Sequence, residues 1–173
     1  KSVFHLMIIG MIFTIILGGL SHFAYNWSNK NTIIGIFSPV NESIWEHFKL
    51  GVWPTILFSI LAYPLLKDHT NNYIIAITAI VYLIPIIIFF LYKIYTSILG
   101  SNVLIIDILI FIISVVISYL IGYKIMTGDS LPNIYNLFAW VLLLQLLLRF
   151  ILFTFIPPRR PMFKDNNTGT YGI

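Results

Sequence analysis

The chain alternates between long apolar stretches and short polar segments rich in Asn, Lys, Asp and Gly. A hydrocarbon core about 30 Å thick is crossed by a helix of roughly 20 apolar residues. The pattern therefore predicts one all-α domain, a polytopic membrane helix bundle with about five transmembrane helices and a polar tail. The expected spans are residues 3–25, 50–66, 73–92, 102–123 and 134–156, and the expected tail is residues 157–173.

The second apolar stretch is too long for a simple span. Ser38 followed by Pro39 is a typical helix start. A helix from there to Leu66 would have roughly 28 residues, or about 42 Å at 1.5 Å per residue. We therefore expect its first turns, residues 39–49, to form an interfacial or re-entrant segment before the second span.

Composition supports a membrane location and narrows the partners. Hydrophobic residues make up 59% of the chain and charged residues only 9%, against about 25% charged residues in soluble domains. The net charge of +4 suits contact with anionic headgroups of membrane lipids, and no basic, aromatic-interleaved patch points to nucleic acid. The absence of cysteine excludes thiolate catalysis and thiolate metal sites.

Five spans place the chain's polar segments on two faces. Residues 67–72 and 124–133 share the face of the N-terminus, whereas residues 26–49, 95–101 and the tail share the other. Most ionisable residues at membrane depth belong to this second face, so the pattern predicts a single polar site there. These residues are His22, Glu42, Glu46, His47, Asp107 and Arg149.

The distribution of basic residues suggests an orientation. The site face carries more Lys and Arg than the opposite face, and cytoplasmic loops are enriched in these residues. We therefore expect a multi-pass protein of the cell membrane with a cytoplasmic site face. The basic residues of the site face are Lys30, Lys93, Arg159, Arg160 and Lys164.

Two charges are expected at similar depth on consecutive spans. Charges inside a membrane normally face the bundle interior and find partners. Asp107 and Arg149 are thus predicted to form an ion pair between the fourth and fifth helices. An Arg held in this way can also clamp a phosphate or carboxylate, which makes Arg149 a candidate catalytic residue.

The densest polar motif runs from Ser38 to Lys49. If this segment is helical, Glu42 and Glu46 lie one turn apart and can grip one divalent cation, such as zinc or manganese. In that hypothesis, His22 and Asp107 complete the metal site from other spans.

Within the same motif, two other residues allow different interpretations. His47 lies about 100° around a helix from Glu46, so it is a poor co-ligand of that carboxylate and is assigned with Glu46 to acid–base catalysis. Lys49 offers an alternative without metal, because it can neutralise Glu42 or Glu46 directly.

The tail is rich in turn-forming residues and has two interpretations. It is either a disordered basic segment that touches lipid or an ordered plug over the site. In the second case Asp165 and Tyr171 are expected to contribute hydrogen bonds.

Two motifs carry a family resemblance. The run Ser-Pro-Val-Asn-Glu-Ser-Ile-Trp-Glu-His at residues 38–47, combined with Thr-Gly-Thr-Tyr-Gly-Ile at residues 168–173, resembles an uncharacterised family of small bacterial integral membrane proteins. The resemblance covers almost the whole chain. It implies a bacterial membrane protein and assigns no activity.

Three functions compete on this reading. The first is a metal-dependent enzyme acting on a lipid or isoprenoid headgroup, which is favoured because acids, histidines and Arg149 converge at one depth. The second is a small-solute transporter or ligand-binding subunit, whose short chain would require a homo-oligomer or a partner membrane protein. The third is an accessory subunit without chemistry, in which the polar residues only orient helices.

Overall fold

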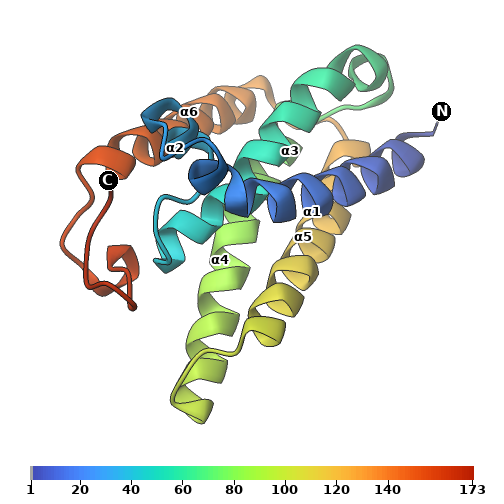
Figure 1. The fold of residues 1–173 in the computed structure, drawn as a ribbon. Helices are drawn as coiled ribbons and strands as arrows, with labels where there is room; N and C mark the ends of the chain where they lie inside the picture. Colours follow the sequence, from blue (N-terminus) through green and yellow to red (C-terminus); the bar gives the residue numbers. More distant parts are fainter. Residues whose placement is uncertain (1) are drawn as a thin grey trace.

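Residues 2–173 form five long helices and three short ones, the last of which lies in a folded tail. The computed structural model describes residues 2–173, and Figure 1 shows the order of the elements along the chain. All five long helices are long and apolar enough to cross a membrane, so the five-span prediction is confirmed. The elements are α1 (Val3–Trp27), α2 (Thr32–Phe37), α3 (Ile44–Leu66), η1 (Lys67–His69), α4 (Tyr73–Leu99), α5 (Leu104–Thr127), α6 (Asn133–Phe155) and η2 (Pro161–Phe163).

Small residues bring α1 against α3. A side chain at Gly18 would overlap the carbonyl oxygen of Leu50, and one at Gly10 would overlap the Phe58 ring. Glycine at position 18 therefore lets the two backbones approach closely, and glycine at position 10 makes room for the Phe58 ring. Because His22 follows Gly18 by one helical turn, the same approach brings its imidazole to the first turn of α3.

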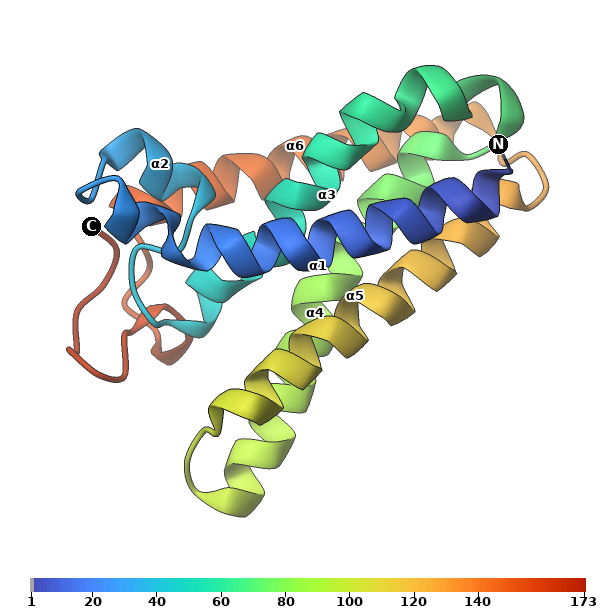
Figure 2. The same ribbon diagram turned by 45° about the vertical axis from the view of Figure 1, so that its right-hand side comes forward.

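Helix α6 packs on α4 and α2, whereas α5 packs on α4 and α1. The hydroxyl of Thr78 donates to the carbonyl of Ala139 at 3.2 Å, and that of Tyr82 donates to the carbonyl of Leu142 at 2.9 Å. Figure 2 shows α6 and α5 on opposite sides of the molecule. The loop between α4 and α5 lies apart from the end of α1 and the start of α3. Consecutive helices α5 and α6 are thus separated along most of their length.

The helix that contains the second span starts later than expected. The long helix predicted from Pro39 begins instead at Ile44, because Ser43 is the N-cap and its hydroxyl accepts the backbone N–H of Glu46 at 3.3 Å. A Ser cap followed three residues later by Glu is a recognised helix start. The segment before this span is a turn that follows the short helix α2.

Ser38, the N-cap expected from the sequence, has a different partner. Its hydroxyl donates to the carbonyl of Ser21 at 2.6 Å and accepts the backbone N–H of Tyr25 at 3.0 Å. Both contacts lie on the last turns of α1. Ser38 therefore ties the segment before α3 to α1 and does not start a helix.

On the opposite face, one buried amide joins two loops. The side chain of Asn72 donates to the carbonyls of Ile125 and Asp129 at 2.9 Å each and accepts the backbone N–H of Leu131 at 3.0 Å. The α3–α4 and α5–α6 connections thus lie together, as the five-span topology requires.

Between the two faces lies a closed hydroxyl cluster. The hydroxyl groups of Thr14 and Tyr119 are 2.7 Å apart, and Thr55 lies 3.3 Å from Tyr119. All three side chains are buried. They join α1, α3 and α5 in a packed layer of the bundle.

Candidate metal centre

Three side chains from α1 and from the start of α3 converge at the site face. The Nε2 atoms of His22 and His47 are 3.3 Å apart, and an Oε2 atom of Glu42 lies 3.7 Å from the first and 3.2 Å from the second. These three residues, called the His/Glu cluster below, can present one ligand atom each to a metal ion.

Local backbone structure aims Glu42 and His47 at each other. Asn41 accepts the backbone N–H of Ser43 at 2.9 Å, which closes a tight turn before the helix. Glu42 sits in this turn, outside α3, while His47 is one turn inside the helix. The two residues therefore face each other at the start of the helix. A helix that began at Pro39 would have prevented this contact, because Glu42 would then be helical.

A backbone carbonyl fixes the tautomer of His47. Its Nδ1 atom lies 2.8 Å from the carbonyl oxygen of Ser43, and because a carbonyl only accepts, Nδ1 must carry the proton. Nε2 of a neutral His47 then presents its lone pair to the cluster. Such a hydrogen bond on the far nitrogen is the usual support of a metal-binding histidine.

Glu42 supplies negative charge to the cluster. The imidazoles of His22 and His47, when protonated, hold the pKa of its carboxyl well below the usual range. Glu42 is therefore ionised at neutral pH, although its side chain remains half exposed. Two imidazoles and a carboxylate that face one another repel through their lone pairs unless a proton or a metal cation lies between them.

The spacing of the three atoms matches the ligands of a small cation. Zinc binds histidine nitrogen and carboxylate oxygen at about 2.0–2.2 Å in tetrahedral geometry, which places neighbouring ligand atoms about 3.3–3.6 Å apart. The observed separations are 3.2, 3.3 and 3.7 Å. A single ion can therefore contact all three atoms with little movement, and its fourth position stays open.

A cavity of about 450 Å³ extends from the His/Glu cluster. Asn166 and Asn167 of the tail line it together with the cluster, and the rest of its wall is mainly apolar and comes from α1, α3, α4 and α5. Three wall residues, Phe23, Leu104 and Ile108, are also exposed on the surface of the bundle. The cavity is therefore open sideways, between α1 and α5.

Asp107 lines this cavity and does not belong to the His/Glu cluster. Its carboxylate accepts a hydrogen bond from the Tyr95 hydroxyl and another from the Asn102 side chain, the latter at 3.1 Å. Asp107 had been predicted as a metal ligand. The structure places it instead in a second polar group on the wall of the same cavity.

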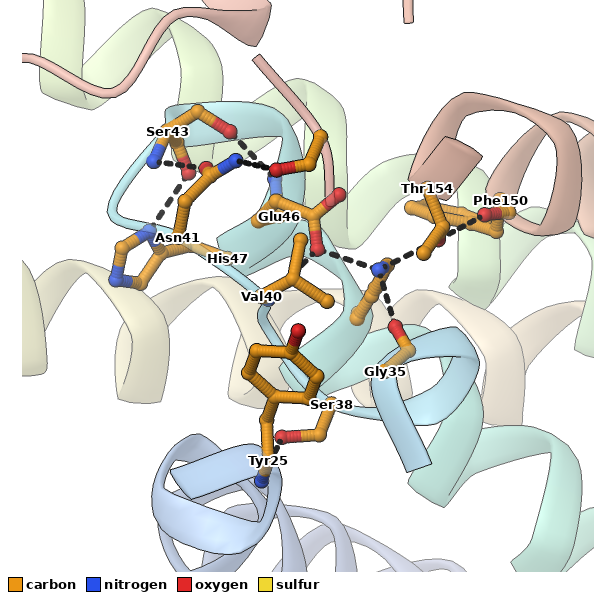
Figure 3. A network of polar contacts seen from close by, with 12 residues as sticks. Tyr25, Gly35, Ser38, Val40, Asn41, Ser43, Glu46, His47, Phe150 and Thr154 are labelled. Atoms are coloured by element: carbon orange, nitrogen blue, oxygen red, sulfur yellow. Dashed lines mark hydrogen bonds and ion pairs between the residues drawn. The ribbon is translucent and has the colours of Figure 1, made fainter. Parts of the chain in front are cut away.

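Glu46 is held in a separate ion pair, shown in Figure 3. The Lys49 ammonium donates to the Glu46 carboxylate, to the Gly35 carbonyl at 2.8 Å and to the Thr154 hydroxyl at 2.8 Å. The Glu46 carboxylate also accepts the backbone N–H of Val40 at 3.1 Å. The alternative in which Lys49 neutralises an acid of this motif is thus confirmed. The hypothesis that Glu42 and Glu46 bind one metal ion from successive turns of a helix is wrong, because Glu42 lies outside α3.

The tail is ordered over the site. The buried carboxylate of Asp165 accepts the backbone N–H groups of Glu42 at 3.2 Å, Asn167 at 2.7 Å and Thr168 at 3.3 Å. Backbone pairing of Lys164 with Tyr171 closes the loop. The interpretation as an ordered plug is confirmed for Asp165, which also supports the turn that carries Glu42.

Aromatic packing and the chain's last residues anchor the tail to α3 and α6. The ring of Phe163 lies 4.9 Å from that of Trp45, which stacks on Phe150 at 4.8 Å. The backbone N–H of Ile173 donates to the carbonyl of Thr154 at 3.0 Å. The tail thus joins the His/Glu cluster to the helices behind it.

The predicted Asp107–Arg149 ion pair is wrong. Helices α5 and α6 separate, Asp107 is satisfied by Tyr95 and Asn102, and Arg149 is exposed on α6. Among residues 2–173, Arg149 neither forms a salt bridge nor lines the cavity. The structure therefore does not bring it to the His/Glu cluster.

Replacing Arg149 gives a direct check of this correction. Arg149→Leu should not lower the melting temperature, because it leaves no buried charge without a partner and surface substitutions usually change stability by less than about 0.5 kcal/mol. Thermal unfolding of the purified protein in detergent measures this. A large loss of stability would instead indicate a partner for Arg149.

The fold and the cluster define a multi-pass membrane protein with a group of side chains that can hold a metal ion. The chain belongs to a family of unknown function (DUF6512), whose family model matches residues 2–173. No curated protein and no solved structure matches the chain. The predicted resemblance to a family without known activity is thus confirmed, whereas its bacterial origin stays a prediction.

Proposed function

We propose that the protein is a metal-dependent membrane hydrolase that acts on the polar end of a membrane amphiphile. His22, Glu42 and His47 would hold one divalent cation, with zinc the best fit. The observation that carries the proposal is the triangle of three ligand atoms at 3.2–3.7 Å, opening into a cavity between helices.

The ligand set supports zinc and hydrolysis. Two histidines and one carboxylate with an open fourth position are the donors of hydrolytic zinc sites. When bound in such a site, zinc lowers the pKa of a water molecule to about 7 and polarises a neighbouring carbonyl. Manganese prefers more oxygen ligands and is the weaker candidate.

Asp107 is the residue best placed to accept the proton of the attacking water and to return it to the leaving group. Its carboxylate lines the same cavity as the His/Glu cluster and is oriented by Tyr95 and Asn102. In hydrolysis, water adds to the carbonyl carbon and the bond to the leaving oxygen or nitrogen breaks. Asp107 would take the proton from water and return it to the leaving group, so that the products are an acid and an alcohol or amine.

The packed hydroxyl layer supports an enzyme over a transporter. The wall of the cavity comes from the half of each helix that adjoins the site face, and Thr14, Thr55 and Tyr119 are buried beyond it. A transport path would need an opening through this layer. A pocket that ends at this layer and opens sideways suits a reaction on a molecule of one leaflet.

Metal analysis of the purified protein tests the proposal. After removal of loosely bound metal, we expect one zinc per chain. His22→Ala, Glu42→Ala and His47→Ala should each weaken zinc binding by more than about 100-fold, since loss of an outer partner alone costs 10–100-fold. Competition with a fluorescent zinc chelator measures these affinities.

His69→Ala is the matched control. This histidine is exposed in η1 and lies outside the His/Glu cluster, so its replacement should leave zinc binding unchanged. The proposal fails if the wild-type protein binds zinc no better than the three cluster variants. Equal losses in the control would show that binding is unspecific.

A further inference from the structure

Charge is distributed unevenly between the cavity and the rest of the site face. Glu42 and Asp107 are the acidic residues of the cavity wall, and no Lys or Arg belongs to that wall among residues 2–173. Lys49, which is close in sequence, is fully buried and already paired with Glu46. A molecule in the cavity therefore meets no basic side chain on the wall that residues 2–173 form.

This distribution is unfavourable for a phosphate. Phosphate sites in proteins are built from Arg, Lys or clustered backbone N–H groups. A divalent cation in the His/Glu cluster would only offset the charges of Glu42 and Asp107. A phosphate headgroup would then add negative charge to a wall that contains no cation to receive it, and a quaternary ammonium would face the metal ion.

The shape of the cavity indicates what lies beyond the polar group. From the His/Glu cluster the wall continues through apolar residues of α1 and α5 to the exposed Phe23 and Leu104. Gly19 lies on this wall, and a Cβ at that position would meet no atom within 4 Å. An apolar passage that is open at its side accepts a hydrocarbon chain that remains in contact with the bilayer.

We infer that the cavity binds an amphiphile with an uncharged polar group, such as an acyl ester or amide, with that group at the His/Glu cluster and its hydrocarbon chain along Gly19 between α1 and α5. The inference rests on the proposed metal centre and names its substrate class. It replaces the anionic headgroup expected from the sequence, because Arg149 is absent from the cavity wall.

Cobalt-substituted protein in lipid nanodiscs provides the test. The visible absorption of bound Co²⁺ reports a ligand entering the open position. The first probe is dodecanohydroxamic acid, which joins a long chain to a metal-binding group that is neutral in free solution and loses a proton when it binds the metal. Acetohydroxamic acid lacks the chain, and dodecyl phosphate carries a group that is already anionic in solution. We expect dodecanohydroxamic acid to bind at least about tenfold more tightly than acetohydroxamic acid, since each buried methylene strengthens binding about fourfold. It should also bind at least about tenfold more tightly than dodecyl phosphate, because the wall formed by the described residues offers an anionic group no Lys or Arg.

A variant that fills the passage distinguishes binding in the pocket from partitioning of the probe into the bilayer. Gly19→Leu should weaken dodecanohydroxamic acid by about tenfold or more while leaving acetohydroxamic acid within about twofold. Ile16→Phe is the control, because Ile16 is exposed on the same helix outside the cavity wall. It should change neither affinity.

The outcomes are distinct. Tighter binding of dodecyl phosphate, or equal effects of Gly19→Leu on both hydroxamic acids, would overturn the inference while the metal centre stands. Absence of a cobalt spectrum that depends on His47 would remove the metal centre and the inference together.

Discussion

Lys49→Met is expected to destabilise the protein by about 3–5 kcal/mol, the usual cost of breaking a buried ion pair by removing one partner. The Lys49 side chain is 0% exposed and that of Glu46 is 2% exposed. Without the ammonium, the Glu46 carboxylate is left buried beside the N–H group of Val40 alone, and the Gly35 carbonyl and Thr154 hydroxyl lose a donor.

The melting temperature should fall by at least about 6 °C, at 2–4 °C per kcal/mol for a chain of this size. Tryptophan fluorescence during heating in detergent is a suitable readout. Lys67→Met removes an exposed lysine and should change little.

A double variant separates lost charge pairing from lost packing. Glu46→Gln combined with Lys49→Met removes both charges, so it should recover more than half of the stability lost in Lys49→Met. If Lys49→Met alone melts like the wild-type protein, the ion pair does not hold α3 to α2 and α6.

The second large effect is expected at Asp165. Asp165→Ala removes the acceptor of three backbone N–H groups, including that of Glu42. Each hydrogen bond to a charged group contributes about 1.5–3 kcal/mol, so a loss of at least about 3 kcal/mol is expected. Because the turn that holds Glu42 is then unsupported, zinc affinity should also fall by about 10-fold or more.

Two further variants are needed to interpret the result of Asp165→Ala. Asp165→Asn keeps one acceptor oxygen and should lie between the wild-type protein and Asp165→Ala in both stability and zinc affinity. Asp129→Ala, at an exposed position of the opposite face, should alter neither. Loss of stability without any change in zinc affinity would restrict Asp165 to a role in folding the tail.

The five spans could be predicted because span length and apolar composition are local properties of the chain. The start of α3 was placed at Ser38–Pro39 although Ser43 and Glu46 also form a capping pattern. The choice between them depends on Ser38, whose hydroxyl is taken up by α1 through Ser21 and Tyr25. Such a contact between distant segments has no local signature.

The metal ligands could be predicted only in part for the same reason. His22 and Glu42 are among the predicted ligands, whereas His47 is assigned to catalysis because a helix turns it about 100° away from Glu46. Because the predicted start of this helix is wrong, Glu46 is predicted as a ligand where the structure has His47. Similarly, the pairing of Asp107 with Arg149 assumed that consecutive helices are neighbours, whereas α6 packs on α4 and α2.

The hydroxyl cluster of Thr14, Thr55 and Tyr119 bears on the electrical integrity of the membrane. Polar side chains at membrane depth invite water, and a continuous file of water would conduct protons. Here the three hydroxyl groups satisfy one another inside an apolar layer that includes the fully buried Val52 and Val115. This layer therefore interrupts any continuous path for protons between the polar site and the opposite face of the bundle.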